Sequence, residues 1–174
     1  MKNKIVIYFH GYNSSSFSWK VEELRKHFRT YSWDINVDPN ISIPHLKNKI
    51  DDILIDIIND ANTSLVFVGT SLGAWYASVL SIAYNAKLVA INPCYDPKKT
   101  LNELGAKQPI SESYFDMPFP KQGKYFIAID DEVIDFNPIK NVLNELNTTY
   151  VKNSNHRFNG KEFNLVIEHI QNLT

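Results

Sequence analysis

The sequence predicts an α/β fold in which helices cover both faces of a six-stranded, mostly parallel sheet. Short runs of β-branched and aromatic residues alternate with longer stretches whose apolar residues recur at helical spacing. Several short runs are almost continuously apolar, as expected of strands buried on both faces. The chain has 174 residues, of which 44% are hydrophobic and 21% charged, so we expect a single domain over 1–174 with its own core.

The six expected strands are short, and a turn or helix signal follows each of them. They span residues 4–9, 33–38, 65–69, 87–91, 124–129 and 148–152. The strict alternation of these runs with helical patterns predicts parallel pairing.

The expected helices have apolar residues three and four positions apart. The first stripe follows serines 14–16, which are candidate helix caps, and consists of Phe17, Val21, Leu24 and Phe28. A second stripe runs from Leu46 to Ile58, and its acids at 51, 52 and 56 are expected on a solvated face rather than in a metal site. Further helices are expected at 72–84, around 138–146 and at 161–172.

One segment, residues 93–123, departs from this alternation. It holds five of the eight prolines, many aromatic residues and a helical pattern only near 96–104. Long irregular excursions in compact domains are commonly functional or poorly ordered. We expect a cap-like excursion here.

Charge and cysteine usage exclude several classes of protein. Eighteen basic against nineteen acidic residues leave a formal charge of −1, which disfavours binding to nucleic acid. Cys94 is the single cysteine, so no internal disulfide can form and a reducing, cytoplasmic location is expected. The apolar run 5–9 is too short for a signal peptide. The uncharged stretch 61–86 is interrupted by glycine, which favours a buried strand and helix over a membrane span.

The strongest local signal is Gly69-Thr70-Ser71-Leu72-Gly73, between an apolar strand and a helix. This is the G-x-S-x-G pattern of a nucleophile elbow in the strand–turn–helix context that the elbow requires. A Cβ at either glycine would crowd the tight turn, and the helix N-terminus favours negative charge on a reacting oxygen. The pattern predicts Ser71 as a nucleophile.

A serine needs a base to take its proton, and in this architecture an acid and a histidine follow the serine in chain order. Asp131 follows the strand 124–129, and His156 follows the last expected strand. Parallel strands place both at the sheet edge that carries Ser71. Asp131 is the preferred acid, while three neighbouring carboxylates remain competitors: Asp130, Glu132 and Asp135.

Backbone N–H groups must stabilise the oxyanion of acyl transfer. Leu72, next to the nucleophile, and Tyr12, in the loop after the first strand, are the candidate donors, and Gly11 allows close approach. His10 is expected to shape this loop rather than act as a base. The remaining histidines, at 27, 45 and 169, are expected at the surface.

Together these motifs resemble the YqiA-like esterases of the α/β-hydrolase superfamily. The similar segments run in the same order along almost the whole chain: 7–15, 68–73, 91–93, 131–135 and 155–158. The resemblance implies a minimal α/β-hydrolase fold without a large lid, and a Ser71, Asp131 and His156 triad that hydrolyses carboxylic esters or thioesters. Two departures are Ala74 and Asp130, where the family usually has glycine.

The expected activity is therefore that of a serine esterase or thioesterase acting on a small-molecule acyl ester or thioester, without a metal or organic cofactor. His10, Gly11, Tyr95 and Phe119 are candidate substrate-pocket residues, although the aromatic side chains of the excursion could equally pack on the sheet. The alternative is a catalytically silent hydrolase-fold protein that uses the same crevice for binding. Oligomeric state is left open by these residues.

Overall fold

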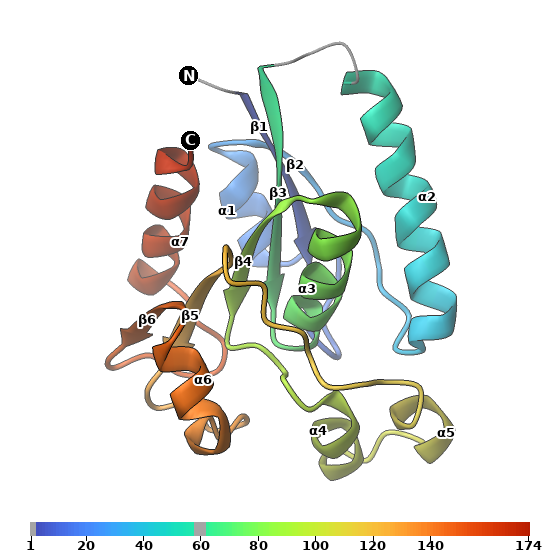
Figure 1. Ribbon diagram of the computed structural model, residues 1–174, viewed down its shortest axis with the longest axis vertical. Coiled ribbons are helices and arrows are strands. Elements are labelled where there is room, and N and C mark those ends of the chain that lie inside the picture. The colour runs from blue at the N-terminus through green and yellow to red at the C-terminus, as the bar shows by residue number, and fades with distance from the viewer. Residues whose placement is uncertain (1–2, 58–61) are drawn as a thin grey trace.

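The computed structural model describes residues 3–57 and 62–174. Six parallel strands form one open sheet in the order β2-β1-β3-β4-β5-β6 (Figure 1). The strands are β1 Asn3–Phe9, β2 Arg29–Tyr31, β3 Thr63–Thr70, β4 Lys87–Ile91, β5 Lys124–Ala128 and β6 Asn147–Val151. The helices are α1 Trp19–Arg25, α2 Pro39–Ile57, α3 Leu72–Tyr84, α4 Pro97–Glu103, α5 Gln108–Ser111, the 3-10 helix η1 Asn137–Ile139, α6 Lys140–Asn144 and α7 Lys161–Asn172.

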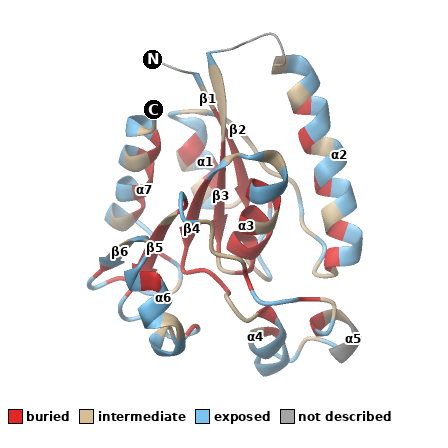
Figure 2. Cartoon of the chain, in the orientation of Figure 1, coloured by how far each residue is buried: buried red, intermediate tan, exposed pale blue. Residues whose placement is uncertain are grey.

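The helices cover both faces of the sheet, which confirms the predicted fold class. Alternate residues of β1 divide between two cores, with Ile7 and Phe9 facing α2 and α3, and Val6 and Tyr8 facing α1 and α7. The most buried residues lie on the strands and on α3 (Figure 2). Apolar burial at about 25 cal/mol per Å² makes these two layers the main source of stability.

The predicted strand 33–38 is wrong: β2 is Arg29–Tyr31, and residues 33–38 form irregular chain. In this segment, side chains make the hydrogen bonds to the backbone that a neighbouring strand would make in a sheet. The Ile35 N–H donates to His10, and the Asn36 carbonyl accepts from Ser42 and Tyr76. The alternating apolar residues that suggested a strand still pack partly against the core.

Two expected helices begin at other residues. Helix α1 begins at Trp19 after Ser18, so Phe17 lies outside it and is 76% exposed rather than part of the inner stripe. Helix α2 begins at Pro39, where the Asp38 carboxylate accepts the Asn40 N–H. Proline suits this first position because its missing N–H would have no intrahelical acceptor. Ile58, predicted in the stripe of α2, lies outside the described residues.

The excursion between β4 and β5 carries α4 and α5 beyond the carboxyl ends of the strands (Figure 1). Side-chain hydrogen bonds attach it to α3. The Trp75 indole N–H donates to the Phe115 carbonyl at 2.8 Å, and the Ser78 hydroxyl donates to the Pro118 carbonyl. Within the uncharged stretch, residues 63–70 form β3 and residues 72–84 form α3. No helix in the described ranges has the length and apolar character needed to cross a bilayer.

Candidate active site

Ser71 stands at the turn between β3 and α3, with φ of 56° and ψ of −123°. A positive φ is strained for a residue with a side chain and persists only where the surroundings hold it. Three backbone hydrogen bonds do so here: the Ser71 N–H donates to the Ile91 carbonyl at 2.9 Å, and the Ser71 carbonyl accepts the N–H groups of Ala74 and Cys94. The predicted elbow is therefore present as a strained, multiply anchored turn.

The two glycines of the elbow are required by close backbone contacts. A Cβ on Gly69 would collide with the Gly73 carbonyl, and a Cβ on Gly73 would collide with the Phe9 carbonyl of β1. The sequence argument anticipated the first collision, within the turn. The second depends on how α3 packs against β1 and follows only from the tertiary structure.

Strand register brings the loops of the site together. Phe9 lies opposite Gly69, so the residues after β1 lie beside Thr70 and Ser71. Ala128 lies opposite Val151, so the loop after β5 lies beside the loop after β6. These loops carry Asp131 and His156, as expected from parallel strands.

Asp131 and His156 are in direct contact. The imidazole Nδ1 lies 2.8 Å from Oδ2 and 3.0 Å from Oδ1 of the Asp131 carboxylate. Oδ1 also accepts the backbone N–H groups of Val133 and Ile134, each at 2.8 Å. The Asp131 side chain is 1% exposed and that of His156 is 16% exposed. The carboxylate is thus held in place, and it fixes the orientation of the imidazole ring.

The three competing acids have other surroundings. Glu132 accepts the backbone N–H of His156 at 2.9 Å, and this bond holds the pKa of the Glu132 carboxyl below its ordinary value. The Asp135 carboxylate accepts both the backbone and side-chain N–H groups of Asn137. Asp130 is exposed and borders a separate hollow with residues 153–155. Of the four carboxylates, the one in contact with the imidazole is that of Asp131.

Ser71 and His156 line one cavity of about 460 Å³ together with Gly11 and Tyr12. A Cβ on Gly11 would lie 3.3 Å from the Ser71 Cβ, so glycine lets the loop after β1 approach the elbow closely. Leu72 is the first residue of α3, and its N–H therefore has no acceptor within the helix. The assignment of Tyr12 and Leu72 as oxyanion donors stays a prediction.

His10 is buried and both of its ring nitrogens are bonded. Nε2 accepts the Ile35 N–H at 3.0 Å, because a backbone N–H can only donate. Nδ1 then carries the ring proton and donates to the Gly11 carbonyl at 2.9 Å. These bonds join the loop after β1 to residues 33–38, and the ring does not border the cavity that contains Ser71.

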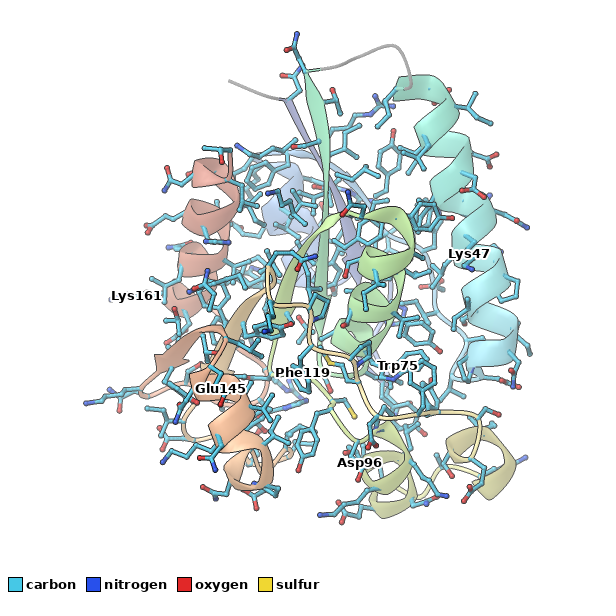
Figure 3. The ribbon with its side chains drawn as sticks, in the orientation of Figure 1. Lys47, Trp75, Asp96, Phe119, Glu145 and Lys161 are labelled. Atoms are coloured by element: carbon cyan, nitrogen blue, oxygen red, sulfur yellow. The ribbon has the colours of Figure 1, made fainter. Side chains whose placement is uncertain are left out.

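Tyr95 and Phe119 also lie away from that cavity. The Tyr95 hydroxyl donates to the Asp135 carbonyl at 3.0 Å. The Phe119 ring packs against the Tyr125 ring, with 5.6 Å between the ring centroids, on the side of the sheet that α3 covers (Figure 3). Their assignment to a substrate pocket stays a prediction.

Asn92 is a site residue that sequence reasoning missed. Its side chain is fully buried, with φ of 43°, directly after β4. The side-chain N–H₂ donates to the carbonyls of Asn155 and His156 at 3.1 and 3.0 Å, and Oδ1 accepts the Ala128 N–H at 2.7 Å. Asn92 thus joins the histidine loop to the ends of β4 and β5. The sequence signal that could have identified Asn92 is a polar residue between an apolar strand and a proline.

Cys94 is buried in the core beside the elbow, and its backbone N–H donates to the Ser71 carbonyl. Burial raises the pKa of its thiol to about 12. A protonated thiol is a poor nucleophile at neutral pH, so Ser71 is the better candidate.

The family described as "Uncharacterised protein family (UPF0227)" matches residues 5–174. The chain belongs to this family. It is the YqiA family, which confirms the resemblance stated from the sequence.

Solved structures show the same fold. An alpha-beta serine hydrolase homologue from Coxiella burnetii has a TM-score of 0.65 at 16% identity, covering 99% of this chain and 85% of that one. Est1E from Butyrivibrio proteoclasticus, solved with ferulic acid, has a TM-score of 0.71 at 12% identity, covering 98% and 87%. A monoacylglycerol lipase from Paleococcus ferrophilus has a TM-score of 0.62 at 13% identity, covering 96% and 91%. The fold is that of the α/β-hydrolase superfamily.

Proposed function

We propose that this protein is a serine hydrolase that cleaves carboxylic esters or thioesters through an acyl-enzyme on Ser71. The observation that carries the proposal is the contact of Asp131 with the imidazole of His156, on a loop that shares a cavity with the nucleophile elbow. The likeness to Est1E and to a monoacylglycerol lipase supports the same class of reaction.

In the proposed mechanism, the Ser71 hydroxyl oxygen attacks the acyl carbon while neutral His156 takes its proton. Asp131 keeps the imidazole in the required tautomer and stabilises the imidazolium. The N–H groups of Leu72 and Tyr12 bind the oxyanion. The bond from the acyl carbon to the alcohol or thiol then breaks, and His156 protonates the leaving group.

Water completes the cycle. It attacks the acyl carbon of the acyl-enzyme while His156 takes a proton from the water. The bond between the carbon and the Ser71 oxygen then breaks, and His156 returns the proton to that oxygen. The products are a carboxylic acid and free serine. The proposed reaction therefore needs no reactant other than the protein, the ester and water.

A fluorophosphonate probe tests the nucleophile directly. We expect the wild-type protein to be labelled at Ser71 and Ser71→Ala to remain unlabelled, because the probe reacts only with an activated serine. Ser64→Ala, on the same strand but outside the cavity, is the matched control and should be labelled like the wild type.

Turnover is measured on acyl esters and thioesters of graded chain length. We expect Ser71→Ala to lose about 10³-fold or more in kcat/KM. A folded wild-type protein that is neither labelled nor active on this panel would contradict the proposal and favour the binding-protein alternative.

A further inference from the structure

Two basic residues border the cavity that contains Ser71 and His156. Lys20 reaches it from α1, and Arg157 reaches it from the loop after β6. No carboxylate lines this cavity in the described part of the chain. The whole protein carries a formal charge of −1, so this cationic cavity is a local feature rather than part of a basic surface.

Lys20 is held in position although its charge has no acidic partner among the residues that the structure describes. The half-buried ammonium donates to the Arg157 carbonyl and, at 3.4 Å, to the Asn159 side-chain oxygen. These bonds place a positive charge next to the backbone of the histidine loop. Burial, and then the charge of Arg157, lower the pKa of Lys20 to about 8.

Neither cation forms an ion pair within residues 3–57 and 62–174. Arg157 is near enough to Glu132 to contribute to the low pKa of that carboxyl. Glu132, however, accepts the backbone N–H of His156 and borders a different cavity of about 690 Å³. Arg157 is exposed, and its charge repels the half-buried Lys20 ammonium, which has also lost hydration. A bound anion offsets both costs.

The chemistry of the two side chains suits an oxyanion. A guanidinium can bind a carboxylate or phosphate with two parallel hydrogen bonds, and an ammonium adds a third donor. Aromatic residues form another part of the cavity wall, namely Tyr8, Tyr12 and Trp19, the last of which is 47% exposed. The cavity thus combines an apolar wall with a cationic one.

Building on the proposed esterase function, we propose that the preferred substrate is an ester that carries a carboxylate or phosphate, which Lys20 and Arg157 bind while Ser71 attacks the acyl carbon. Hydrolysis then follows the steps given above, and the anionic group takes no part in bond breaking. Lys20 and Arg157 act as specificity-determining residues.

The test compares matched acetyl esters. The substrates are 4-acetoxybenzoate, 4-acetoxyphenyl phosphate and neutral 4-acetoxybenzamide, which differ in the group opposite the ester. Monophenyl glutarate and its neutral amide place the charge on the acyl side instead. We expect the wild type to show a higher kcat/KM for an anionic ester than for its neutral partner. The series also shows whether a carboxylate or a phosphate is preferred, and whether the charge must lie on the acyl side or the alcohol side of the ester bond.

The variants Lys20→Met and Arg157→Gln remove one charge each. We expect each to lower the anionic-to-neutral ratio of kcat/KM about tenfold, the size of a lost hydrogen bond to a charged group. Lys20→Arg should retain most of the ratio. Lys26→Met is the matched control, since Lys26 follows the same helix, pairs with Glu23 and lies outside the cavity.

A wild-type ratio of one or less, or ratios unchanged in both Lys20→Met and Arg157→Gln, would overturn the proposal. Calorimetric binding of 4-hydroxybenzoate against 4-hydroxybenzamide separates this failure from that of the esterase function. If 4-hydroxybenzoate binds in a way that depends on Lys20 and Arg157 but no ester is hydrolysed, the anion site is supported and the proposed esterase function is contradicted. If the protein neither binds the anion nor hydrolyses an ester, both the anion site and the esterase function are contradicted.

Discussion

At the scale of single residues, the site depends on side chains whose hydrogen bonds leave them one orientation. Asp131 uses Oδ1 to accept two backbone N–H groups, so its carboxylate cannot rotate away from His156 without breaking them. Ser71 is held at a positive φ by three backbone bonds. Preorganisation of this kind would lower the reorganisation that the proposed reaction requires.

The choice of acid can be tested with two amide substitutions. We expect Asp131→Asn to lower kcat by about 10³- to 10⁴-fold, because the amide favours the wrong imidazole tautomer. Asp135→Asn should leave kcat within about threefold of the wild type, since its carboxylate bonds only Asn137 among the described residues. Initial rates on a neutral ester measure both. A large loss in Asp135→Asn alone would show that the acid is misassigned.

At the scale of elements, two strands, β4 and β5, and the histidine loop meet at Asn92. Its side chain bonds the end of β5 and the two carbonyls around His156, and its own N–H donates to the Phe126 carbonyl. The histidine loop is therefore tied to the middle of the sheet rather than to its own strand alone. Movement of this loop would carry His156 away from Ser71.

The variant Asn92→Asp tests this positioning role. Aspartate keeps an acceptor for the Ala128 N–H but places an oxygen against the carbonyls of Asn155 and His156. We expect kcat to fall about tenfold or more with little change in KM, because a misplaced base slows chemistry more than binding. Asn141→Asp, at an exposed position on α6, is the control. A drop in thermal stability with an unchanged kcat would show a purely structural role.

At the scale of the whole molecule, charge is balanced overall and uneven locally. With a formal charge of −1, the protein has little long-range field, and exposed charges are screened beyond about 8 Å at physiological salt. In our proposal, recognition of an anionic ester therefore depends on Lys20 and Arg157 at short range. This makes selectivity sensitive to the protonation of one lysine.

The pH dependence follows from the lowered pKa of Lys20. Its positive charge is present below about pH 8 and is lost as the pH rises through that value. A guanidinium group stays charged throughout this range, and burial raises the pKa of Tyr8, which also lines the cavity, to about 12. We expect the anionic-to-neutral ratio of kcat/KM to fall above about pH 8, since kcat/KM reports the free enzyme. Taking the ratio cancels pH effects on the triad. A flat ratio between pH 7 and 10 would contradict the role of Lys20.

Local signals in the sequence determined much of the fold. The apolar runs of β1, β3 and β4, the spacing in α3 and α7, and the elbow around Ser71 all depend on residues within a few positions of one another. The chain order of serine, acid and histidine, with parallel strands, placed all three at one edge of the sheet. Such features can be predicted because near neighbours decide them.

Contacts between distant residues were decided by the tertiary structure alone. Residues 33–38 have the alternation of a strand, but the His10 ring, 25 positions before Ile35, takes up the Ile35 N–H, and the chain there is irregular. Other contacts in the site also join residues that are far apart in the sequence. His156 contacts Asp131 rather than a neighbouring acid, Asn92 bonds the histidine loop, and Lys20 bonds the Arg157 carbonyl 137 positions away. Strand register and loop packing set these distances, and neither is encoded in any short stretch of sequence.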